Sequence, residues 1–294
     1  MLLPFLHTAS GPYQFHWALH ADVVLFCVFL EAGYLYAITQ LRDVVSDAGR
    51  VRRKQVLLFT SGVAAIYFVA GTPVHDLSEQ YLLSMHMIQH TVFTLVAAPL
   101  LLAGIPAWLW QALLRQRGIM PIARRLVNPV VAFGLFNLLM VMTHLPNAVD
   151  YSLNHHWFHF AVHAALTVSA MLMWWPILSS VPELPRLTAP LRMAYLFLQS
   201  LIPTVIAAFV TFADGAVYPF YERAPRIWGL SAEADQQIAG GMMKLIGSLI
   251  LWTFIAIAFF EWYAREQNQG QEPRWDEVEE ELHHLGLTDA QKRG

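Results

Sequence analysis

Charged residues are scarce in this sequence, and their scarcity excludes an ordinary soluble globular protein. They make up 13% of the 294 residues, against about 25% in soluble domains, whereas 56% of the residues are hydrophobic. An aromatic content of 13% excludes a disordered chain. The net charge of -3 offers no basic surface for nucleic acid. The single cysteine, Cys27, excludes an intrachain disulfide and any thiolate cluster built from this chain alone.

What the sequence does contain is a series of long apolar stretches. About 20 helical residues cross the roughly 30 Å of hydrocarbon in a bilayer, and seven stretches approach or exceed this length: 17–40, 54–71, 82–103, 129–146, 158–178, 191–213 and 238–261. Tryptophans near their ends, such as Trp108, Trp174 and Trp175, are interpreted as interfacial anchors. The sequence therefore predicts an all-α integral membrane protein, a seven-helix transmembrane bundle. We expect an N-terminal segment over 1–16, a membrane domain over 17–262 and an acidic tail over 263–294.

The basic residues predict the orientation of this bundle. Fifteen of the 18 lysines and arginines lie on one side of the seven spans, in segments 41–55, 104–128, 179–192 and 265–293. Because cytoplasmic loops carry an excess of lysine and arginine, this side is predicted to be cytoplasmic. The N-terminus is then outside, and the C-terminus is in the cytoplasm.

Histidine is unusually frequent, with 13 residues, and 11 of them fall in the predicted outer half. Three pairs are spaced by four residues, namely His16 with His20, His86 with His90 and His159 with His163, so each pair projects from one helix face. A polar side chain buried in the membrane needs a partner, and neutral imidazole is the commonest metal ligand. We therefore predict a metal site at the outer face. The candidate ligands are His20, His75, His86, His90, His144, His159 and His163.

Other side chains of this half could support the site. Thioethers suit Cu(I), and four methionines share the outer or middle membrane with the histidines: Met85, Met87, Met140 and Met142. Of these, Met85 and Met142 are predicted to support the site. Asp214 and Asp235 flank the loop between the last two spans, where a carboxylate could attract a cation or hold a ligand histidine. Glu31 and Lys244 lie inside spans, where a charge usually marks a pathway or a pair.

Several long motifs carry a family resemblance. They include HMIQHTVFTLVAAPLLLAGIP (86–106), THLPNAVDYSLNHHWFHFAVH (143–163) and TFADGAVYPFYERAPRIWGLSAEADQQIAGGMMK (211–244). Over residues 15–262 the chain resembles the CtaG family of cytochrome c oxidase assembly factors, the polytopic type associated with caa-type oxidases. By position, the family's histidine motifs fall on His86, His90, His144, His159 and His163. Its outer-loop motifs fall on Asp214 and on the run that includes Asp235 and Gln236.

The resemblance implies a function without catalysis. It implies an assembly factor of the bacterial inner (plasma) membrane that binds copper, Cu(I) rather than Cu(II), at a site facing the periplasm. The copper would be delivered to the oxidase copper centres. The implied partners are oxidase subunits, a periplasmic copper chaperone and the lipid bilayer, with no nucleic acid.

The residues of the sequence are also compatible with three other functions. Oxygen-dependent membrane hydroxylases and desaturases also carry histidine-rich helices, although their sites face the cytoplasm. A single haem between His90 and His163 would make a haem-binding membrane protein. A copper transporter would use Glu31 inside the first span to carry the ion across the membrane.

Overall fold

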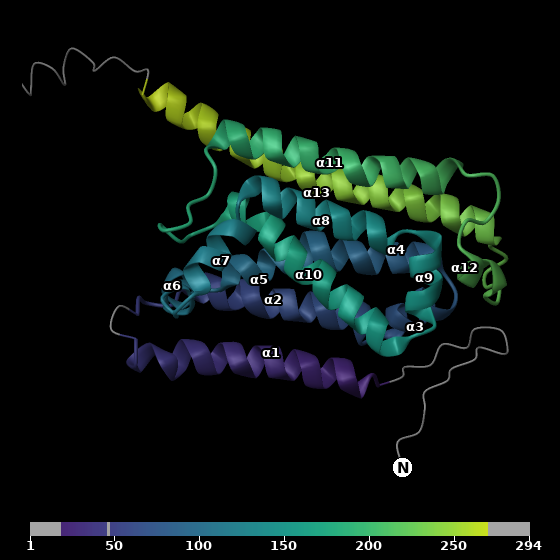
Figure 1. Ribbon diagram of the computed structural model, residues 1–294, viewed down its shortest axis with the longest axis horizontal. Coiled ribbons are helices and arrows are strands. Elements are labelled where there is room, and N and C mark those ends of the chain that lie inside the picture. The colour runs from purple at the N-terminus through teal and green to yellow at the C-terminus, as the bar shows by residue number, and fades with distance from the viewer. Residues whose placement is uncertain (1–18, 46–47, 270–294) are drawn as a thin grey trace, which may run out of the picture.

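The computed structural model describes residues 19–45 and 48–269, and every regular element within them is helical (Figure 1). The prediction of an all-α protein is therefore confirmed for this part of the chain. The N-terminal segment expected over 1–16, and residues 270–294 of the expected tail, lie outside the described residues. In chain order the elements are α1 (Ala21–Thr39), the 3₁₀ turn η1 (Leu41–Asp43), α2 (Arg53–Ala70), α3 (Pro73–Gln80), α4 (Leu83–Thr91), the π-helical η2 (Val92–Ala97), α5 (Ala98–Gly104), α6 (Ala107–Leu114), α7 (Ile119–Leu126), α8 (Pro129–Thr143), α9 (Pro146–Leu153), α10 (His156–Leu178), α11 (Ala189–Phe212), α12 (Pro219–Arg223) and α13 (Ala232–Gln269).

Five helical segments are long and apolar enough to cross a membrane: α1, the run α4–η2–α5, α10, α11 and α13. Two bent helix pairs, α2 with α3 and α7 with α8, raise this number to seven if each pair forms one span. The described part of the chain thus has five to seven candidate spans, as in a membrane protein, and the count of seven stays a prediction. The boundary expected at residue 263 falls inside α13, because this helix continues to Gln269.

The two bends have local causes in the sequence. Between α2 and α3 the chain turns by 51° at Gly71, where Thr72 accepts a hydrogen bond from the Val74 amide and Pro73 begins the next helix. Between α7 and α8 it turns by 70°, and Asn128 caps α8 in the same way in front of a proline. Proline at the first position of a helix lacks only an N–H that the helix would leave unpaired, so it marks a new start.

The helices place the histidines and the basic loops at opposite ends of the bundle. In Figure 1, α3, α9 and α12 lie at one end, whereas α6, α7 and the loop 179–188 lie at the other. We call the first of these the histidine end, because α3 and the adjoining ends of α4 and α10 carry most of the candidate ligands. The long helices α11 and α13 run side by side along one edge, and α1 lies along the opposite edge.

The tryptophans correct one expectation. Trp108, Trp174 and Trp175 are buried, so the interpretation of these three as interfacial anchors is wrong. In two of the three, the indole N–H has a hydrogen-bond partner in the interior. The Trp174 Nε1 donates to the Thr94 carbonyl at 2.9 Å, and the Trp175 Nε1 donates to the Leu184 carbonyl at 3.1 Å.

Three further contacts fix how the helices pack. Gly104 ends α5 so close to α2 that an added Cβ would lie 2.5 Å from the backbone nitrogen of Phe59. At the end of the bundle opposite the histidines, buried Arg192 of α11 forms an ion pair with Glu261 of α13 at 3.0 Å. At the histidine end, exposed Arg223 pairs with Asp150 at 2.8 Å.

Candidate metal centre

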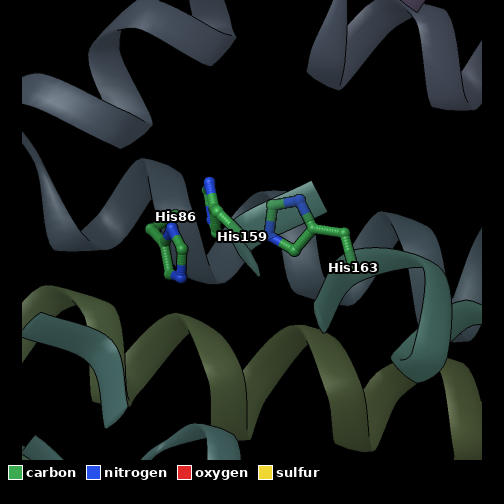
Figure 2. Close-up of side chains that lie close together, drawn as sticks. All are labelled: His86, His159 and His163. Carbon is green, nitrogen blue, oxygen red and sulfur yellow. The ribbon is translucent and has the colours of Figure 1, made fainter. Parts of the chain in front are cut away.

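Three histidines from two helices come together at the histidine end. His86 lies on α4, and His159 and His163 lie one turn apart on α10. Each offers one ring nitrogen, and these nitrogens all lie within 4.8 Å of one another. Figure 2 shows the three imidazoles gathered between their helices. We call this set the histidine triad. It is the one group of three or more His, Cys, Asp or Glu side chains close enough to hold a metal ion among the described residues.

Two more predicted ligands extend the triad. The Nε2 of His90 lies 3.2 Å from the Nε2 of His163, and the ring of His90 lies 4.4 Å from that of His86. The ring of His144 lies 5.3 Å from that of His90. The structure therefore brings together five of the seven predicted histidines, drawn from α4, the end of α8 and α10.

The cluster leaves several buried nitrogens without a hydrogen-bond partner. They are Nδ1 of His86, Nδ1 of His90, Nε2 of His144 and Nε2 of His159. A buried polar atom without a partner costs free energy, about 1–3 kcal/mol each. A metal ion held by the ring lone pairs would satisfy such nitrogens. The donor set and its unpaired atoms thus fit a metal that prefers imidazole, such as copper or zinc.

Glu79 of α3 belongs to the candidate site, and the sequence reasoning missed it. Its Oε1 lies 2.8 Å from Nδ1 of His159 and 3.2 Å from Nδ1 of His75. With Nδ1 of His159 donating to this carboxylate, Nε2 carries the lone pair and faces the triad. Metal-bound histidines usually donate their second N–H to such a carboxylate. The signal in the sequence was the spacing of four between His75 and Glu79 on one helix face.

The two remaining predicted histidines lie beside the triad rather than in it. The rings of His20 and His75 meet edge to face at 4.6 Å. Nδ1 of His75 also lies 3.2 Å from the amide nitrogen of Gln89. The Nε2 of His20, just before α1, lies 3.5 Å from Asp76, and this carboxylate raises the pKa of His20.

A cavity of about 200 Å³ lies next to the triad on the side of α1. His159, His163 and Glu79 line it, and Asp22 and His156 line its solvent-exposed part. His156 Nε2 lies 3.5 Å from Asp22, with both side chains about half exposed. Carboxylates and imidazoles thus extend from the surface to the buried triad.

The predicted outer-loop residues differ in their positions. Asp235 is 1% exposed and its carboxylate accepts hydrogen bonds from the amides of Leu83 and Ser84, at 2.7 and 3.3 Å. It thereby caps the start of α4, the helix that carries His86 and His90. Gln236 accepts from the Val217 amide and donates to the carbonyl of Gly215, which ties the loop before α12 to α13.

Three other supporting residues are not brought to the cluster. Asp214 is exposed. Met142 is 45% exposed on the outside of α8. Met85 packs instead against a small apolar group at the histidine end, formed by Tyr81, Leu82 and Ile227.

The charges inside the spans form local contacts. Glu31 accepts a hydrogen bond from the Thr60 hydroxyl at 2.7 Å, between α1 and α2. Lys244 of α13 donates to the Thr204 hydroxyl of α11 at 2.6 Å. Each charge therefore links two neighbouring helices.

The π-helical segment η2 begins two residues after His90. Such segments are rare and are often found at functional sites. Here the segment is held by Trp174 through its hydrogen bond to the Thr94 carbonyl, while the Thr94 hydroxyl donates to the carbonyl of His90. The widened turn thus connects the histidine helix to the buried face of α10.

The fold and site together define a class: a polytopic helical membrane protein with a buried, histidine-rich candidate metal centre. Comparison with protein-family models matches residues 32–265 to the family described as Cytochrome c oxidase caa3 assembly factor (Caa3_CtaG). The chain belongs to this family, which confirms the resemblance found in its motifs. No curated protein sequence and no solved structure matches the chain. The family supports a role in oxidase assembly, association with the oxidase and a place in the membrane, and it is not a class of catalytic enzymes.

Proposed function

We propose that this chain acts in oxidase assembly by binding copper at the histidine triad and delivering it to the copper centres of the oxidase. The observation that carries the proposal is the convergence of three imidazoles within 4.8 Å of one another, with Glu79 beside them. Imidazole binds both copper and zinc, so the family's link to a copper-containing oxidase favours copper.

The proposal includes an orientation in the membrane. The basic loops lie at the end of the bundle away from the histidines. By the positive-inside rule, the histidine end then faces the periplasm across a bacterial plasma membrane. A copper ion from a periplasmic chaperone would then meet Asp22 and His156 at the surface before it reaches the triad.

Metal analysis of the purified protein tests copper binding. The variant His86→Ala/His159→Ala/His163→Ala is compared with the wild type and with the surface variant His155→Ala, which removes an exposed histidine of the same end that does not line the cavity. We expect the triad variant to contain at least one copper ion fewer per chain than the wild type while it still inserts, and the surface variant to keep most of its copper. Equal copper content in the triad variant and the wild type would contradict the proposed site.

Delivery and orientation need separate experiments. Oxidase purified from cells that express the triad variant should contain less copper than oxidase from wild-type cells.

For orientation, His155→Cys and Arg117→Cys are each made in a Cys27→Ser background and treated with a membrane-impermeant maleimide on intact spheroplasts. We expect labelling at position 155 alone, and labelling at 117 alone would reverse the orientation.

The geometry bears on one of the alternatives. A haem between His90 and His163 would require both Nε2 atoms to reach its iron from opposite faces. These two nitrogens lie 3.2 Å apart, in hydrogen-bond contact, with ring centroids 5.0 Å apart. No macrocycle fits between rings in direct contact, so this arrangement favours a metal ion.

A further inference from the structure

A second cavity lies on the other side of His90 from the triad. Its volume is about 40 Å³, and residues of α4, η2, α8, α11 and α13 line it, among them the exposed Lys244. None of the triad histidines lines it, whereas His90 and His144 both do. His90 therefore separates two spaces, with the triad on the α10 side and this inner cavity on the α8 side.

The two histidines present unpaired nitrogens in this buried region. Nδ1 of His144 lies 2.7 Å from the Met140 carbonyl, to which it donates, and this contact leaves the lone pair on Nε2. That Nε2 is buried and has no hydrogen-bond partner, and neither has Nδ1 of His90. Both residues are about 5% exposed. Each ring thus has a nitrogen that could serve as a ligand.

Three methionines contribute to the lining, beside polar side chains such as Thr94 and Gln199. Met87, Met140 and Met243 line the inner cavity, and all three are buried. Thioether sulfur is a soft ligand that selects Cu(I), whereas hard cations prefer oxygen. Met87 belongs to α4 and Met140 to α8, the helices that supply His90 and His144.

We infer that His90, His144 and the thioethers of Met87 and Met140 form a second metal site, which takes a soft monovalent ion such as Cu(I) or Ag(I). This inference rests on the proposed metal-binding function and adds a second site of different chemistry beside the triad. His90 contacts His163 of the triad at 3.2 Å, so an ion could pass between the sites by exchange of this one ligand.

Replacement of the methionines by residues of similar side-chain volume tests the inner site. Leucine and methionine have similar volumes, and such exchanges in a core are well tolerated. The variant Met87→Leu/Met140→Leu removes the two thioethers proposed as ligands, and the matched control Met85→Leu/Met142→Leu removes two methionines that do not line the cavity. Purified proteins in detergent are titrated with Cu(I) against a chromophoric Cu(I) chelator, and with Ag(I) by calorimetry.

We expect the inner variant to bind one Cu(I) fewer per chain, or to bind it roughly tenfold or more weakly, while the control matches the wild type. X-ray absorption of the copper-loaded wild type should show sulfur neighbours, and these should vanish in the inner variant. Unchanged Cu(I) stoichiometry and affinity in the inner variant, or a wild-type spectrum with nitrogen neighbours only, would overturn the inference.

The triad variant separates this inference from the proposed function. If the triad variant keeps one tightly bound Cu(I) with sulfur neighbours, the inner site stands by itself. If the triad variant loses its copper and the inner variant equals the wild type, the triad stands and the inner site fails. If the triad variant keeps all of its copper, the proposed function at the triad fails.

Discussion

Replacement of Asp235 by alanine should destabilise the protein through the start of α4. Its carboxylate accepts hydrogen bonds from two buried amides, and from the Ser84 hydroxyl at 2.5 Å. A buried donor left unpaired costs about 1–3 kcal/mol, and loss of a negative charge at a helix N-terminus adds about 0.3–1 kcal/mol. We expect a loss of about 3 kcal/mol, which lowers Tm by about 6–12 °C at 2–4 °C per kcal/mol.

The measurement is thermal unfolding of purified protein in detergent, followed by intrinsic tryptophan fluorescence. Asp214→Ala is the matched control, because Asp214 is an exposed acidic residue of the neighbouring loop, and its Tm should change by about 1 °C or less. Equal Tm values for the two variants would refute the capping role. Since α4 carries His86 and His90, the Asp235 variant should also bind copper more weakly. Weaker binding with an unchanged Tm would instead assign Asp235 a direct role in the site.

Three further substitutions have expected effects on Tm in the same assay. Gly104→Ala places a Cβ against the backbone of α2 and should cost about 1–3 kcal/mol, whereas Gly134→Ala meets open space and should be neutral or slightly stabilising. Arg192→Ala leaves a carboxylate without its buried partner and should cost about 2–3 kcal/mol, whereas Arg223→Ala breaks an exposed pair worth about 0–1 kcal/mol. Trp174→Phe removes the hydrogen bond to the π-helical segment and should cost about 1–3 kcal/mol, and an unchanged Tm would argue that this segment needs no such support.

The spacing of residues along the sequence predicted which histidines share a face of one helix. It did not predict which helices lie together. The spacing of four correctly placed His86 with His90, and His159 with His163, on single helix faces. The sequence could not show that the histidines of α4 lie against those of α10, because spacing within a helix gives only the shared face and does not identify the neighbouring helix. The contact of Glu79 with His159 depends on the bend before α3, so the sequence showed only its spacing from His75.

The methionines illustrate the same limit. Met85 and Met87 lie two residues apart, as do Met140 and Met142, and an offset of two rotates a side chain by about 200° around a helix. One member of each pair must therefore face away from the other. The sequence-based choice of Met85 and Met142 as supporting residues depended on which face points inward, and the structure places Met87 and Met140 at the inner cavity with His90 and His144.

The donor atoms change in a definite order from the surface inward. Asp22 and His156 are half exposed, Glu79 stands between two histidines beneath them, the triad is imidazole alone, and the inner cavity adds thioethers to imidazole. Anionic oxygens thus lie beside imidazoles near the surface, and thioethers lie beside imidazoles at the inner cavity. Hard divalent cations prefer the oxygens and a soft monovalent ion prefers the sulfurs. At the two proposed sites we therefore expect zinc to compete with copper at the triad and not at the inner cavity.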